Sequence, residues 1–223
     1  MTYTQRRRPV NSPYLDSITE IRFTGAGETL MQPDGRWDIA VLKRGDDVKV
    51  LRTGLTTRPV VYEHACGDET LVISFKPSVF MPLMPGEVMR DEGVLLERFG
   101  RRGFWIGTDV REIPTLENAD VFVEHLVRQE IVTNNTIVAS MLDGQPKAMS
   151  ERTMQRHFLK TTGLTYKAFT QIERAQRAVS LLQMGRPAAD VAFALGYADQ
   201  AHMINSLRFI MGQTPGQIAR AAL

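Results

Sequence analysis

The chain has 223 residues, of which 43% are hydrophobic and 23% are charged, and its formal net charge is +2 at pH 7. This composition is typical of a globular protein, and the length favours two small domains over one large domain. No run approaches the roughly 18 apolar residues of a membrane span, and no apolar stretch follows the polar start, so we expect a cytoplasmic protein without a membrane partner.

Residues 1–117 are expected to form a β-rich sensor or regulatory domain, because short β-branched and aromatic runs alternate with Gly, Pro and Asp turn signals. The predicted strands are Ile18–Phe23, Trp37–Leu42, Val48–Leu51, Pro59–Ala65 and Thr70–Lys76. They predict an antiparallel β barrel or sandwich, whereas the Met- and Pro-rich segment Phe80–Gly86 has no clear preference. We expect Arg6–Arg8 in a solvated, disordered tail, with a contact to a phosphate backbone as the alternative.

Near Asn118 the apolar spacing changes to three and four, so the chain is predicted to be helical from there on. We expect a connecting helix in 118–133 and an all-helical domain in 134–223, which makes the fold class α+β. The expected helices in that domain are Asn135–Leu142 (stopped by Gly144 and Pro146), one starting at Ser150, Tyr166–Met184, Ala188–Leu195 and one capped by Asp199.

The charge is divided unevenly between the two halves of the chain. Residues 1–146 contain 17 lysines and arginines against 21 aspartates and glutamates, a net charge of −4, whereas residues 147–223 contain 10 against 4, a net charge of +6. A basic module joined to an acidic one is what a phosphate-binding domain with a separate input domain would show.

An internal repeat with an offset of 49 residues lies in the basic part. Pairs of equivalent residues at this offset are Ser150 and Asp199, Met154 and Met203, Phe158 and Leu207, Gly163 and Gly212, and Thr165 and Thr214. In each copy these residues act as an N-cap, two inward apolar positions, a terminator and a following threonine. Because a short helix and a turn precede each copy, each half has the form of a helix-turn-helix.

The outward face of each repeated helix could enter a major groove. On a helical wheel, Arg152, Gln155 and Arg156 project away from the core in the first copy, and Ala201, Asn205 and Arg208 do so in the second. Guanidinium groups pair with guanine edges, and amides pair with adenine edges. A merely solvated polar face is the alternative, but two such helices about 34 Å apart could contact successive grooves.

The segments Ser150–Phe158, Thr162–Thr165, Gly196–His202 and Gly212–Pro215 resemble the C-terminal domain of AraC-family regulators, over about Asn134 to Ala219. The resemblance implies a tandem helix-turn-helix domain whose two recognition helices contact DNA. By position, it implies DNA contacts from Arg152, Gln155, Arg156, Gln200, Ala201, His202, Asn205 and Arg208.

The second helix departs from the family pattern, since Asn205 and Phe209 stand where basic residues are common. Arg208 is then its only cation, so we expect the first helix to supply more of the affinity and discrimination. Phe209 is expected to be partly exposed, or alternatively to pack against a neighbouring helix.

The N-terminal half is similar to cupin-like sensor domains. Metal-binding cupins carry a His-x-His pair, whereas His64 stands alone in its segment. The single cysteine, Cys66, is expected to be a buried structural residue. We therefore expect no metal or other cofactor. Four aromatic residues could line an effector pocket, but core packing is the more common role of such residues. They are Trp37, Tyr62, Phe75 and Trp105.

The sequence therefore predicts a sequence-specific transcription regulator that binds double-stranded DNA. RNA polymerase, a small-molecule effector and a second copy of the chain are its further expected partners. Nonspecific, nucleoid-like DNA binding is one alternative. The other is a cupin-type enzyme with a basic appendage, but the chain lacks metal ligands, a phosphate-binding loop and a nucleophile and base pair, so we expect no catalysis.

Overall fold

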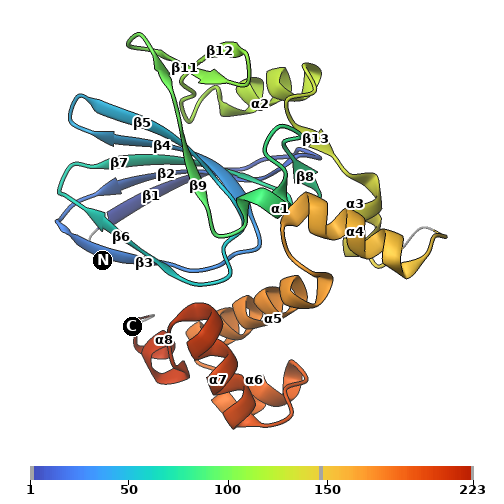
Figure 1. Cartoon of the computed structure of the whole chain (residues 1–223). Coiled ribbons are helices and arrows are strands. Elements are labelled where there is room, and N and C mark those ends of the chain that lie inside the picture. Colours follow the sequence, from blue (N-terminus) through green and yellow to red (C-terminus); the bar gives the residue numbers. More distant parts are fainter. Residues whose placement is uncertain (1–2, 146–147, 222–223) are drawn as a thin grey trace.

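The computed structural model describes residues 3–145 and 148–221, and Pro146, the predicted helix stop, lies outside them. An antiparallel β-rich part comes first and a helical part follows, so the predicted α+β class is confirmed (Figure 1). Within the described residues, no helix combines the length and apolarity that crossing a bilayer requires.

The main sheet of the β-rich part has six antiparallel strands in the order β1-β2-β7-β4-β5-β9, and its edges are open. These strands are β1 (Tyr3–Arg8), β2 (Leu15–Phe23), β4 (Trp37–Arg44), β5 (Asp47–Thr53), β7 (Glu69–Phe75) and β9 (Gly93–Leu96). Smaller antiparallel sheets pair β3 (Gly27–Met31) with β6 (Val60–His64), β8 (Val79–Phe80) with β13 (Thr133–Asn134), and β10 (Arg98–Phe99) and β12 (Asp109–Glu112) with β11 (Gly103–Ile106). The four-residue helix α1 (Gly86–Met89) precedes β9.

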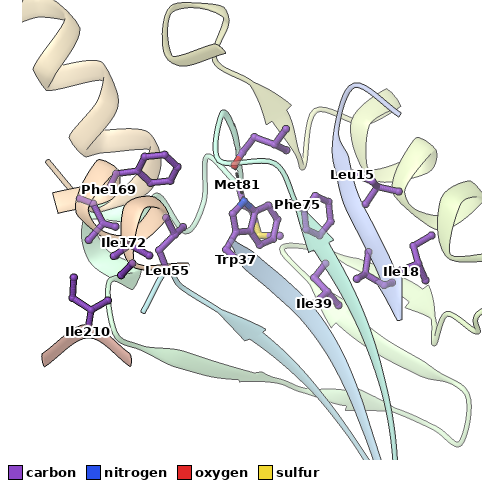
Figure 2. Packing of buried hydrophobic residues seen from close by; sticks show 14 of the residues in the cluster. Leu15, Ile18, Trp37, Ile39, Leu55, Phe75, Met81, Phe169, Ile172 and Ile210 are labelled. Carbon is purple, nitrogen blue, oxygen red and sulfur yellow. Dashed lines mark hydrogen bonds between the residues drawn. The ribbon is translucent and has the colours of Figure 1, made fainter. Parts of the chain in front are cut away.

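All five predicted strands are present. Four of them belong to the main sheet, where alternating apolar residues build the core, whereas β6 pairs with β3 and exposes Val60 and Val61. Ile73 is in register with Ile18 on one neighbouring strand and with Ile39 on the other, and all three side chains are fully buried (Figure 2). Trp37 is in register with Phe75, and their rings stack with centroids 3.9 Å apart. The predicted core role of these two aromatic residues is therefore confirmed.

Burial shifts the pKa values of two neighbouring side chains of the main sheet, Arg52 and Asp38. Arg52 is 1% exposed, and its guanidinium carbon lies 4.5 Å from the centre of the Trp37 ring. It donates a hydrogen bond to the carbonyl oxygen of Met84 over 3.1 Å. Asp38 accepts a hydrogen bond from the Ser74 hydroxyl over 2.6 Å. Burial raises the pKa of Asp38 to about 7 and lowers the pKa of Arg52 to about 10.

The expectation of a disordered tail at Arg6–Arg8 is wrong. These residues belong to β1, which pairs along its whole length with β2. Arg8 donates to the carboxylate of Asp120 and, over 3.0 Å, to the carbonyl oxygen of Leu116. The sequence pattern missed the strand because β1 has no alternation of apolar residues.

Cys66 and His64 also differ from one another in environment. Cys66 is exposed rather than buried, since it lies in the turn between β6 and β7. His64 is buried and stacks on Phe23 with ring centroids 3.9 Å apart, and its two ring nitrogens lie within hydrogen-bonding distance of Gly25 and Thr29. Among the described residues, no three His, Cys, Asp or Glu side chains gather as metal ligands.

The helical part begins at α2 and contains the predicted helices. They are α2 (Ala119–Arg128), α3 (Thr136–Leu142), α4 (Glu151–Thr162), α5 (Tyr166–Gln183), α6 (Ala188–Ala194) and α7 (Gln200–Met211). The connecting helix, expected over 118–133, ends at Arg128, and Thr133–Asn134 pairs with β8 as a strand. The ends of the other predicted helices lie within two residues of those expected. A further helix, α8 (Pro215–Ala221), was not predicted, and it packs against α5.

The β-rich part and the helices share one cluster of buried apolar side chains. Phe169 and Ile172 of α5 and Ile210 of α7 belong to the same cluster as Leu55 and Trp37 (Figure 2). Hydrogen bonds cross between the two parts as well. The Gln32 amide donates to Gln213 over 2.8 Å, and the Gln176 amide donates to the carbonyl oxygen of Pro33 over 3.1 Å. The helices are therefore docked on the β-rich part.

Candidate DNA-binding surface

The helix α4 begins and ends at the residues that the sequence indicates. The Ser150 hydroxyl accepts from the backbone N–H of Thr153 over 3.2 Å, and Gly163 ends the helix with a φ of 77°. Such a left-handed terminator favours glycine, which lacks a Cβ. Phe158 is buried, whereas the expected inward residue Met154 is only partly buried.

The side chains predicted to contact bases from α4 are exposed. They are Arg152, Gln155 and Arg156. Gln155 donates to the carboxylate of Glu151, one helical turn earlier, over 3.0 Å. The two arginines have no carboxylate partner among the described residues, so their guanidinium groups are available to an external anion or base edge.

The helix α7 begins with a side-chain N-cap and ends at a left-handed glycine, as α4 does. The Asp199 carboxylate accepts from the backbone N–H of His202 over 2.6 Å, and Gly212 ends the helix with a φ of 68°. Met203 and Leu207 are fully buried, as expected. The repeat is therefore confirmed in three dimensions, since both helices have 12 residues between a side-chain N-cap and a left-handed glycine.

The predicted contact residues of α7 are also exposed. They are Gln200, Ala201, His202, Asn205 and Arg208. His202 is the least free of them, because its ring accepts a hydrogen bond from the N–H of Ala198 and packs edge-on against Tyr197. Phe209 is 64% exposed, which confirms the expected exposure, and the guanidinium carbon of Arg58 lies 5.5 Å from its ring centre.

The repeat extends beyond the two helices. Thr165 caps α5 by accepting from the N–H of Ala168, and Thr214 accepts from the N–H of Gln217 at the start of α8. Each outward helix is thus followed by a threonine-capped helix. In the first unit, the Asn135 side chain caps α3 and also donates to the Thr161 hydroxyl over 2.8 Å, which fixes α3 against α4.

The long helix α5 joins the two units. Its 18 residues span about 27 Å. It packs against α6, α7 and α8, whereas α4 packs mainly against α3 and α1 (Figure 1). The two sets of exposed residues therefore lie on two separately supported helices.

Both recognition-helix candidates end against the β-rich part. A Cβ atom added to Gly163 would lie 2.2 Å from the carbonyl oxygen of Gly86, and one added to Gly212 would lie 2.8 Å from Pro59. These contacts, and the contact between Arg58 and Phe209, were not foreseen from the sequence, because no local pattern reveals which distant loop meets a helix end.

Residues 147–221 match the family model of a helix-turn-helix domain. This chain carries an AraC-type helix-turn-helix domain. The match includes α4, α7 and all eight predicted contact residues. A DNA-binding domain of this type makes the chain a DNA-binding transcription regulator.

The comparison with curated proteins found no match. Among solved structures, the chain is similar to an apo variant of ToxT from Vibrio cholerae strain SCE256, with 10% identity and a TM-score of 0.45, over 97% of this chain and 100% of that one. It is also similar to ToxT from Vibrio cholerae O395 bound to (E)-4-(8-methylnaphthalen-1-yl)but-3-enoic acid, with 8% identity and a TM-score of 0.45, over 100% of both chains. These likenesses are too weak to indicate the function or ligand of this chain.

Proposed function

We propose that this regulator is sequence-specific, and that the AraC-type domain places α4 and α7 in successive major grooves of double-stranded DNA. The observation that carries the proposal is the repeated pair of capped helices, each with exposed side chains able to hydrogen-bond to base edges. Arg152 and Arg156 suit guanine O6 and N7, and the amides of Gln155 and Asn205 suit adenine N6 and N7.

The two helices are expected to contribute unequally. On α4, two unpaired arginines lie one turn apart, whereas Arg208 is the single arginine of α7 and no lysine accompanies it. Because phosphate and guanine contacts provide much of the affinity for DNA, α4 would supply more of the binding free energy. On α7, Ala201 would leave room for a thymine methyl group, and Asn205 would provide hydrogen-bonding discrimination.

The β-rich part would act as the input domain, within a division into 1–117, the connecting helix region 118–133 and the DNA-binding region 134–223. This role is favoured by the contacts of the β-rich part with the ends of α4 and α7. A conformational change in the β-rich part would alter these contacts and so the positions of both helices. A small-molecule effector, self-association and a contact with RNA polymerase in the cytoplasm are further parts of the proposal.

Selection of binding sites from a pool of random DNA duplexes tests the proposal. The full chain should enrich a motif with two half-sites whose centres lie about one helical turn apart. The double variant R152A/R156A should lose enrichment of one half-site, while R177A, which removes an exposed arginine of α5, should retain both. Binding without any enriched motif, and with the same salt dependence on all duplexes, would instead support the nonspecific alternative.

A further inference from the structure

A cleft of about 530 Å³ lies between the β-rich part and the AraC-type domain. One wall consists of the loop after β5, from Thr56 to Val60, together with Arg90 and Asp91, and the other consists of Leu164, Thr165 and Ala168 at the junction of α4 and α5. Its volume falls in the range of small-molecule sites, and its lining combines apolar side chains with a few polar groups, as such sites do.

The charges in this cleft are unbalanced. Arg58 and Arg90 are exposed, and neither forms an ion pair within the described residues. The carboxylate of Asp91 instead accepts from the N–H and the hydroxyl of Thr57. Asp91 has a φ of 60°, a left-handed conformation that is costly for a residue with a Cβ. Asp91 therefore fixes the loop at Thr57 and forms no ion pair with either arginine.

Another cleft of similar volume shows the contrast. It measures about 540 Å³ and is lined by Arg6, Arg7 and Arg8. All three of these arginines pair with acidic residues of the chain, among them Glu117, which itself lines that cleft. An anion would compete there with carboxylates that are already bound. In the interdomain cleft, Asp91 also belongs to the lining, but neither guanidinium group forms an ion pair with a carboxylate of the described residues.

The residues that line the cleft also contact or adjoin the C-terminal ends of both DNA-binding helices. Leu164 and Thr165 directly follow Gly163, the terminator of α4. The guanidinium carbon of Arg58 lies 5.5 Å from the centre of the Phe209 ring on α7, and Pro59 lies 2.8 Å from the position that a Cβ of Gly212 would take. A ligand that draws Arg58 into the cleft would therefore disturb the contact with α7 while it bridges the β-rich part to the start of α5.

We infer that this cleft binds a small organic anion, with an acidic head at Arg58 and Arg90 and an apolar body against Pro59, Val60 and Leu164. Occupancy of the cleft is coupled to the placement of α4 and α7 on DNA. The coupling rests on the proposed function, whereas the binding of the anion does not.

Isothermal titration calorimetry on the full chain without DNA tests the binding. The probes are 4-phenylbutyrate and phenyl phosphate, with the neutral 4-phenylbutyramide as the matched control. We expect at least one anion to bind about tenfold more tightly than the amide, and R58A and R90A each to weaken its binding about tenfold, because each removes a charged hydrogen-bonding partner. R128A removes an exposed arginine of α2 far from the lining and should leave binding unchanged.

Absence of binding by both anions, or equal binding by the amide, or equal effects of R58A and R128A, would overturn the site. Thermal unfolding of each variant checks that it remains folded. The coupling is tested by fluorescence anisotropy with a selected DNA duplex, whose affinity should change severalfold on addition of the bound anion in the wild type but not in R58A. An unchanged affinity in the wild type would overturn the coupling, and absence of any specific duplex would overturn the proposed function while leaving the calorimetric result standing.

Discussion

Gly163, at the end of α4, lies so close to Gly86 of α1 that a Cβ on Gly163 would be 2.2 Å from the Gly86 carbonyl oxygen. The contact is reciprocal, since a Cβ on Gly86 would be 2.4 Å from the carbonyl oxygen of Thr161. Two backbones can approach this closely only where neither residue carries a side chain. The first DNA-binding helix of the AraC-type domain is thus seated on the β-rich part by backbone packing.

Replacement of Gly163 by alanine should lower the free energy of unfolding by more than about 2 kcal/mol, because it adds a steric clash to the cost of a left-handed residue. Gly185→Ala is the matched control. Gly185 has a φ of 79° but no atom within 4 Å of its would-be Cβ, so this change should cost only about 1 kcal/mol. Urea unfolding measures both values. Equal losses would show that the contact between Gly163 and Gly86 contributes nothing.

Arginine-to-alanine changes on α4 should weaken specific DNA binding more than the equivalent change on α7. We expect Arg152→Ala and Arg156→Ala each to cost about 1–3 kcal/mol on a selected duplex, with relaxed preference at one base position. Arg208→Ala should cost less, because this arginine lies in the last turn of its helix. Fluorescence anisotropy at fixed salt gives the affinities.

Random-sequence DNA provides the control for these arginine variants. A base contact affects the selected duplex far more than random DNA, whereas a phosphate contact affects both equally and reduces the salt dependence. Equal losses on both duplexes for Arg152→Ala and Arg156→Ala would reassign these residues to the phosphate backbone.

The N-caps of the repeated helices should each contribute to stability. Ser150→Ala and Asp199→Ala each remove the acceptor of a backbone N–H and should cost about 1 kcal/mol in the free energy of unfolding. Asp199→Asn retains the acceptor while removing the charge, so it should be nearly neutral in chemical denaturation. If Asp199→Asn destabilised the protein as much as Asp199→Ala, the charge rather than the hydrogen bond would be responsible.

Stability should fall as the pH rises through the range in which Asp38 titrates in the native state. Burial and the neighbouring Asp34 raise the pKa of Asp38 from 3.8 to about 7, so between these values the native state retains a proton that the unfolded state releases. Each unit of pH then lowers the free energy of unfolding. Asp38→Asn removes this contribution. Denaturation from pH 5 to 8 should show a smaller decline in the variant, and an identical decline in both proteins would contradict the assignment.

The sequence predicted the elements whose cause is local. Ser150 and Asp199 mark helix starts because they hydrogen-bond within their own first turn, and Gly163 and Gly212 mark helix ends because the chain turns left-handed there. Four of the predicted strands, β2, β4, β5 and β7, follow from alternating apolar residues that are buried in the main sheet. Helical periodicity placed six of the candidate contact residues on outward faces, and the family resemblance added Gln200 and His202. The structure exposes all eight.

The features that the sequence could not reveal depend on distant partners. The strand β1 shows no apolar alternation, and its Arg8 is held by Asp120, more than a hundred positions away. Cys66 was expected to be buried because of its residue type, but its position in a turn decides its exposure. The cleft at Arg58 and Arg90 combines segments from both parts of the chain, so only the folded structure brings its residues together.

Genome-wide occupancy of the full chain in its native cells tests the central claim most directly, with the R152A/R156A variant expressed at the same level as the control. We expect discrete peaks that share the motif selected from random duplexes, and the loss of those peaks in the variant. Diffuse occupancy with no shared motif, or peaks that persist unchanged in the variant, would contradict the claim.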